Sequence, residues 1–130
     1  MSKTTENYKY KLNMLKARFT YYAYRHGYKE EFVKIFTKLI DLAKNAEREK
    51  LQRMKDFFEA LLAFHKKYER KPLDDKSLES KLKDEKIPQY IMDDDTGNRL
   101  VEYADILAQY IGNKINPNQL RKIFEELRKI

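Results

Sequence analysis

A helix-forming pattern of apolar residues runs through residues 29–68, KEEFVKIFTKLIDLAKNAEREKLQRMKDFFEALLAFHKKY, and it decides the fold class. In both halves of this stretch apolar side chains recur three or four positions apart, which places them on one side of a helix. Between the halves, residues 47–53 are mostly charged and interrupt the stripe. The pattern therefore predicts either one very long helix or two helices bent near Asn45.

The two alternatives differ in what they imply about assembly. An unbroken helix over residues 29–68 would be about 60 Å long, which exceeds the size of a small domain. Its apolar stripe would then need to be covered, and we would expect either self-association as a helix-exchanged dimer or a bundle completed by a partner. Two helices bent near Asn45 could instead bury their apolar stripes against each other.

The composition of the 130 residues points to the same fold class. Three glycines, three prolines and two valines leave few turn or strand formers, whereas charged residues make up 38% of the chain. We expect an all-α fold, a small bundle of four to six helices, in a single helical domain over residues 1–130. No apolar run is long enough for a bilayer, no signal peptide opens the chain and cysteine is absent, so we expect a cytoplasmic protein without membrane partners. The abundance of Lys and Glu is typical of a thermophilic source.

Local signals divide the rest of the chain. A first helix is predicted over residues 7–26 and a later one over residues 98–111, each followed by a glycine. The acidic segment 73–97 is predicted to be a loop or linker, with room for a short helix over residues 76–83. A last helix should begin with the cap Asn116, with Pro117 in its first position and Gln119 completing a capping box.

The net charge of +7 is distributed unevenly. Residues 1–70 carry a charge of +8, residues 71–115 carry −3, and residues 116–130 carry +2. A basic surface of this kind is compatible with nucleic-acid binding and equally with a solvated helical surface.

Residues suited to catalysis or metal binding are few. The two histidines, His26 and His65, are 39 positions apart, and His65 lies on an apolar stripe where a packed histidine is expected. The run Asp93–Asp95 lacks the spacing of a calcium loop and is better explained as the acidic approach to a helix N-terminus. We therefore predict no catalytic residue, no metal site, no cofactor and no enzymatic activity.

Nucleic-acid binding has better candidates in the first helix. Lys11, Arg18 and Arg25 recur every seven residues and so share one side of that helix, and Lys9 and Lys16 lie nearby. Such side chains suit phosphate oxygens and would give salt-dependent binding with little sequence preference. The interleaved tyrosines could stack on bases, but their heptad spacing favours a place in the core.

Three segments together resemble a known family. They are MLKARFTYYAYR (14–25), followed by Gly27; DFFEALLAFHKKY (56–68); and INPNQLRKIF (115–124), with a polar cap before a Leu-Arg pair. Together they cover about a third of the chain and look like the small subunit of the Csm effector complex of type III-A CRISPR–Cas systems. In that family the Leu-Arg motif usually precedes the aromatic-basic helix, whereas here it closes the chain. A circular permutation would explain the order and would require termini that lie close together.

The resemblance implies a prokaryotic, non-catalytic helical subunit of an antiviral ribonucleoprotein. It would stack in copies along the crRNA–target RNA duplex, contact the phosphate backbone and bind other subunits of the Csm complex. Carried over by motif, the RNA-binding residues would be Lys16, Arg18, Arg25, Arg121 and Lys122. Charge placement alone adds three further candidates, Lys9, Lys11 and Arg53.

Two other interpretations of the basic surface stay open. The protein could be a helical protein–protein adaptor with no nucleic-acid role, or a DNA-binding helical domain. The observation that discriminates between them is whether the basic residues of the first and last helices converge on one face.

Overall fold

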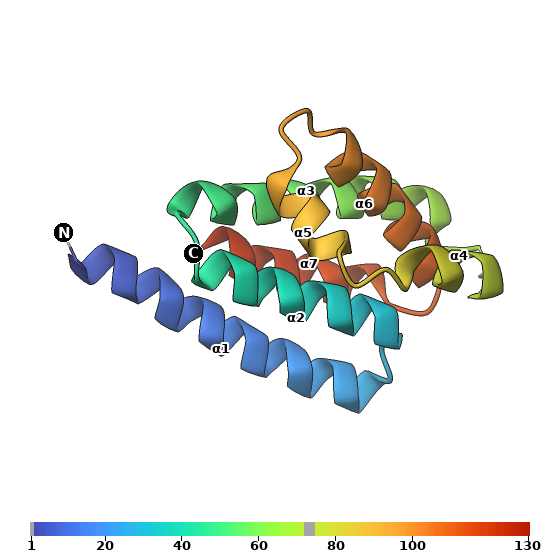
Figure 1. Cartoon of the computed structure of the whole chain (residues 1–130). Coiled ribbons are helices and arrows are strands. Elements are labelled where there is room, and N and C mark those ends of the chain that lie inside the picture. The colour runs from blue at the N-terminus through green and yellow to red at the C-terminus, as the bar shows by residue number, and fades with distance from the viewer. Residues whose placement is uncertain (1, 72–74) are drawn as a thin grey trace.

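The protein is a bundle of helices, as the composition predicts. The computed structural model describes residues 2–71 and 75–130, and in that part of the chain it contains seven α-helices and no strand (Figure 1). The helices are α1 (Ser2–His26), α2 (Glu30–Lys44), α3 (Arg48–Tyr68), α4 (Asp75–Leu82), α5 (Ile87–Asp93), α6 (Asn98–Ile111) and α7 (Pro117–Arg128). The all-α prediction is confirmed, but the expected number of four to six helices was too low.

The region 29–70 forms two helices and contains no very long one. α2 ends at Asn45, whose side-chain amide donates a hydrogen bond to the carbonyl of Asp41 at 3.1 Å, and Glu47 then takes an extended conformation before α3. The side chain of Asn45 thus competes with the helical backbone, and this ends α2. The long-helix alternative is wrong, so the condition under which we expected an exchanged dimer is not met.

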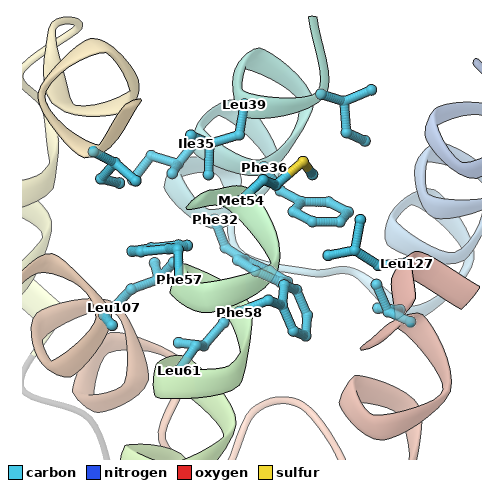
Figure 2. Close-up of a cluster of buried hydrophobic side chains, with 14 of the residues drawn as sticks. Phe32, Ile35, Phe36, Leu39, Met54, Phe57, Phe58, Leu61, Leu107 and Leu127 are labelled. Carbon is cyan, nitrogen blue, oxygen red and sulfur yellow. The ribbon is translucent and has the colours of Figure 1, made fainter. Parts of the chain in front are cut away.

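The apolar stripes of α2 and α3 face each other and form the centre of one core. Figure 2 shows Phe32, Phe36, Phe57 and Phe58 among the side chains that meet there, with Leu107 of α6 and Leu127 of α7 at its edges. A hairpin of two amphipathic helices therefore buries the stripe that one straight helix would have left exposed.

The acidic segment expected to be a loop or linker holds two short helices. α4 and α5 lie within residues 75–93, and they pack on α6 and α2 through buried side chains that include Leu82, Ile87, Ile91 and Met92. Apolar residues spaced for burial were present in this segment, but its charge and Pro88 suggested a loop. Pro88 instead occupies the first turn of α5, where the missing N–H costs no hydrogen bond.

The carboxylate of Asp94 caps α6, as the acidic run before this helix suggested. It accepts hydrogen bonds from the backbone N–H of Arg99 at 2.6 Å and of Leu100 at 3.2 Å, and from Thr96. Burial alone would raise the pKa of Asp94, but these hydrogen bonds outweigh it and lower the pKa below its usual 3.8. Gly97, at φ 78°, makes the left-handed turn that brings the carboxylate to the helix end.

Aromatic contacts connect α1 and α7 to the α2–α3 pair. Ring centroids lie 4.4 Å apart between Phe19 and Phe36, 5.3 Å between Phe36 and Phe58, and 5.8 Å between Phe58 and Phe124. Edge, tilted and stacked contacts of this kind add to the burial of the rings. One aromatic chain therefore links four helices and fixes the place of the first and the last.

The cap predicted for the last helix is present. The side-chain oxygen of Asn116 accepts a hydrogen bond from the N–H of Asn118 at 2.7 Å, and Pro117 begins α7. Gln119, expected to complete a capping box, instead accepts a hydrogen bond from the hydroxyl of Tyr28 at 3.2 Å. This contact ties the α1–α2 turn to the start of α7.

The C-terminus lies close to the first part of α1. The guanidinium of Arg48 donates to the carbonyl of Ile130 at 3.3 Å and lies over the ring of Tyr8 at 5.3 Å. The first turns of α1 and the end of α7 are on the same side of the molecule (Figure 1). Among the described residues, no helix has the length and apolar character that crossing a membrane requires.

Candidate nucleic-acid interface

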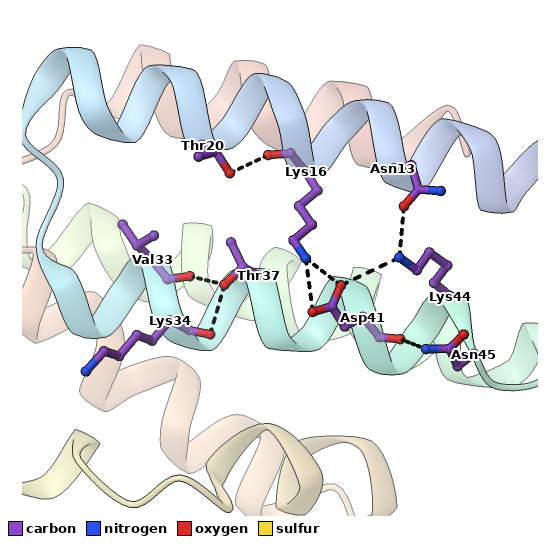
Figure 3. A network of polar contacts seen from close by, with 9 residues as sticks. All are labelled: Asn13, Lys16, Thr20, Val33, Lys34, Thr37, Asp41, Lys44 and Asn45. Carbon is purple, nitrogen blue, oxygen red and sulfur yellow. Dashed lines mark hydrogen bonds and ion pairs between the residues drawn. The ribbon is translucent and has the colours of Figure 1, made fainter.

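One face of α1 is fixed against α2 by a polar network (Figure 3). The ammonium of Lys16 donates to both carboxylate oxygens of Asp41, at 2.8 and 3.1 Å. Lys44 lies 3.8 Å from the same carboxylate and donates to the side chain of Asn13 at 2.9 Å. The network and the buried side of α1 together determine which residues of the helix face the solvent.

A groove of about 560 Å³ lies between α1 and α7, and we call it the α1–α7 groove. It is lined by Tyr22, Asn118, Arg121, Lys122, Glu125, Glu126 and Lys129. Tyr22 comes from α1, and the other residues belong to α7 and the position after it. The two helices that carry the basic sequence motifs thus form one surface.

The positive charge of the groove is only partly neutralised. Glu126 pairs with Arg18 of α1 at 3.4 Å, and Glu125 pairs with Arg128 at 3.2 Å. Each acidic residue of the groove therefore has an arginine of its own. Three exposed cations of the groove form no hydrogen bond or ion pair with the described part of the chain. They are Arg121, Lys122 and Lys129.

Three predicted residues of α1 lie on its outer surface. Lys9 and Lys11 are exposed and have no partner among the described residues. Arg25 is exposed and donates to the hydroxyl of Tyr21 at 2.9 Å, which holds its guanidinium beside the tyrosine ring. These cations can reach an anion without breaking an internal ion pair.

Two other predicted residues are used within the fold. Lys16 is bound to Asp41, as described above. Arg53 donates to the carbonyl of Ile91 at 2.7 and 3.1 Å and also to the carbonyl of Asp94. A cation at the end of a helix satisfies carbonyls that have no partner within it, so Arg53 stabilises the C-terminus of α5. The structure places Arg53 on α3 against α5 and does not bring it to the α1–α7 groove.

The basic residues of the first and last helices do converge. Arg18 contacts α7 through Glu126, and Arg121 and Lys122 line the same groove as Tyr22. Arg18 is the α1 candidate that makes this contact, and nucleic-acid binding stays a prediction.

Several residues of this surface were not among the sequence candidates. Lys129 lines the groove and is not among the candidates that the sequence provides. Tyr10, Tyr21, Tyr22 and Tyr24 are exposed, so the expectation that the tyrosines fill the core was wrong for these four. The signal that could have found them is the absence of Asp and Glu between residues 7 and 29, which marks this side of α1 as a surface for anions.

The two histidines lie in different surroundings. His65 is buried and its Nε2 lies 2.7 Å from the carbonyl of Gly112, as expected of a packed histidine. His26 is exposed and stacks near Tyr28, with ring centroids 6.0 Å apart. The described part of the chain contains no group of three His, Cys, Asp or Glu residues arranged to hold a metal ion.

Comparison with protein families places the first part of the chain in a known family. A family model described as Csm2 Type III-A matches residues 1–71, which is more than half of the chain. The match includes α1 and the segment 56–68, and it ends before the third motif at residues 115–124. No curated protein and no solved structure matches.

Proposed function

Because the chain belongs to the Csm2 family, the small subunit of the type III-A CRISPR effector complex, we propose that it holds RNA by its phosphate backbone along the α1–α7 groove. The family is generally a non-catalytic structural subunit and associates with the other Csm proteins and the crRNA. In the proposed role, copies of this chain stack along the crRNA–target RNA duplex and do not cleave it.

The observation that carries the proposal is the unpaired positive charge of the groove. Arg121, Lys122 and Lys129 lie in one groove without internal partners, and Arg18 stands at its α1 edge. A guanidinium can hold two phosphate oxygens at once, and a lysine ammonium adds a point charge. Lys9, Lys11 and Arg25 extend the same positive surface along α1.

Backbone binding of this kind has a defined signature. Each phosphate that a Lys or Arg neutralises releases counterions, so the logarithm of the binding constant falls linearly with the logarithm of the salt concentration, with a slope of about 0.7 per contact for a single strand. The base sequence of the RNA has little influence on the affinity, because contacts to phosphates do not distinguish one base from another.

The test is RNA binding by the triple variant Arg121→Ala/Lys122→Ala/Lys129→Ala, measured by fluorescence anisotropy across a salt series. We expect weaker binding by similar factors for unrelated RNA sequences and a salt slope lower by about 2, since three contacts are lost. The substituted side chains are exposed, so the fold should survive, and circular dichroism checks this.

A second lysine-bearing groove provides a matched control. Lys34, Lys38 and Lys83 line a groove of about 590 Å³ between α2 and the connection from α4 to α5, where Glu31, Asp84 and Glu85 accompany them. Replacing these three lysines with alanine removes the same charge from a part of the surface that α1 and α7 do not form. If both triple variants lose affinity equally, binding follows net charge alone. If neither loses affinity, the adaptor interpretation becomes the better one.

We also propose that the motifs stand in a circularly permuted order. The contact of Arg48 with both Ile130 and the ring of Tyr8 supports this, because it brings the end of α7 close to the start of α1. Superposition on an experimental structure of another family member is the test. We expect α7 to occupy the place of the helix that precedes the aromatic-basic helix there, and a different place for α7 would contradict the proposal.

A further inference from the structure

Four of the five large hydrophobic side chains exposed in the described residues are tyrosines of one helix. Tyr24 is 91% exposed, Tyr10 63%, Tyr21 57% and Tyr22 36%. Single exposed apolar residues are common on protein surfaces, whereas three exposed rings within four residues, those of Tyr21, Tyr22 and Tyr24, form a group that suits binding. We call these four residues the tyrosine face.

The tyrosine face borders the α1–α7 groove. Tyr22 lines the groove beside Arg121 and Lys122, and its ring centroid lies 5.9 Å from that of Tyr21. Tyr21 in turn accepts the hydrogen bond from Arg25, so a cation capable of binding phosphate is held next to an exposed ring. Flat rings and phosphate-binding groups therefore alternate from the groove onto the outer side of α1.

The charge around the tyrosine face decides what can occupy it. Residues 7–29 contain six Lys or Arg residues and no Asp or Glu. A second copy of this chain would bring a like-charged face against it, and like charges in contact oppose association. The occupant must instead carry negative charge together with flat apolar groups, and a single strand of nucleic acid with unpaired bases has both.

We propose that the tyrosine face binds unpaired bases of single-stranded RNA by stacking, next to the phosphates held in the α1–α7 groove. The inference rests on the proposed function and adds base contacts to it. In a duplex the bases are already stacked on one another, so this face selects a strand, or a stretch of one, whose bases are free. Because every base has a π-face, the contact discriminates little between sequences.

The test compares two probes that share a backbone. One is an oligoadenylate RNA of about ten nucleotides, a length within the usual range of single-strand sites, and the other is an abasic ribose-phosphate oligomer of equal length. Wild-type protein should bind the oligoadenylate more tightly, by about fivefold or more for each stacked base. In the double variant Tyr21→Leu/Tyr24→Leu this difference should shrink by about fivefold or more for each stacking ring lost, while the salt slope for the abasic oligomer stays unchanged because every cation remains.

Two controls separate stacking from general damage. Tyr21→Phe/Tyr24→Phe removes the hydroxyl that accepts the hydrogen bond from Arg25 but keeps the flat rings, so it should keep the wild-type ratio of affinities for the two probes. Tyr90→Leu removes a tyrosine of α5 that also carries an arginine over its ring, with the guanidinium of Arg99 at 4.5 Å, and it should leave RNA binding unchanged.

The outcomes distinguish this inference from the function on which it rests. Equal affinity of wild type for the two probes would overturn the stacking contact and leave phosphate binding in place. Failure of wild type to bind either probe would overturn both. If the leucine variant changed the oligomeric state in light scattering and not the affinity for RNA, the tyrosine face would be an interface between copies and the inference would be wrong.

Discussion

Replacing Glu126 with glutamine should strengthen RNA binding. The carboxylate of Glu126 lines the α1–α7 groove and pairs with Arg18 at 3.4 Å, where the side chains are 32% and 52% exposed. The substitution removes a negative charge from the proposed phosphate path and frees the guanidinium of Arg18. Because an exposed ion pair contributes at most about 1 kcal/mol to folding, the variant should remain folded.

The magnitude follows from the geometry. A phosphate bound by Arg18 would lie within a few ångströms of the Glu126 carboxylate, and two like charges about 4 Å apart in water repel by about 1 kcal/mol. Removing that repulsion should tighten binding by up to about fivefold, and less as salt screens the pair. Arg18 adds one phosphate contact, so the salt slope for single-stranded RNA should become steeper by about 0.7.

Fluorescence anisotropy with a labelled single-stranded RNA across a salt series measures both quantities. The matched control is Glu30→Gln, which makes the same charge change at another exposed ion pair, with Lys34 at 3.1 Å, outside the groove. If the two variants bind RNA with the same affinity and slope, net charge explains the effect. If Glu126→Gln binds no better than wild type, the groove does not carry the phosphates.

Three further predictions concern the fold that presents this surface. Phe58→Ala should lower the free energy of unfolding by about 3–5 kcal/mol in urea denaturation, because Phe58 is buried between Phe36 and Phe124 and the truncation leaves a cavity; a loss below 1 kcal/mol would contradict the aromatic chain. Asn116→Ala should cost about 1 kcal/mol by the same assay, since it removes the cap of α7, and an unchanged midpoint would argue against that cap. Asp94 has a lowered pKa in the folded state, so its carboxylate stabilises the fold above pH 3.8 and this contribution is lost as the pH falls below that value. Asp94→Asn should therefore flatten the acid limb of the stability curve, and a limb as steep as that of wild type would show that this carboxylate is not responsible.

Local sequence signals determined most helix boundaries. The stripe over residues 98–111 and the glycine after it predicted α6 with the bounds that the structure has, and Asn116 with Pro117 marked the start of α7. Gly27 ends α1 in the left-handed conformation, at φ 66°. Caps and glycines act within a few residues of themselves, so their effect is readable from the sequence.

The uneven distribution of charge could also be predicted from the sequence. Which charged side chains bind within the fold and which stay free in the solvent could not. Lys16 and Arg53 resemble Arg121 and Lys122 in the sequence, yet the first two are bound by Asp41 and by the end of α5. Their partners are 25 and 38 positions away in the chain. Only the packing of α1 on α2 and of α3 on α5 brings these groups together.

The tertiary structure alone decided which side of α1 faces the core. The sequence offers two adjacent stripes, one through Leu12 and Phe19 and one through Tyr21 and Tyr24, and either could be buried by spacing alone. The core formed by α2 and α3 buries the first stripe, and the ring centroids of Phe19 and Phe36 lie 4.4 Å apart. Because α1 lies on the surface of the bundle, this core can cover only one side of it. The second stripe is therefore left in the solvent beside the groove, because burial depends on contacts between distant parts of the chain that local spacing does not encode.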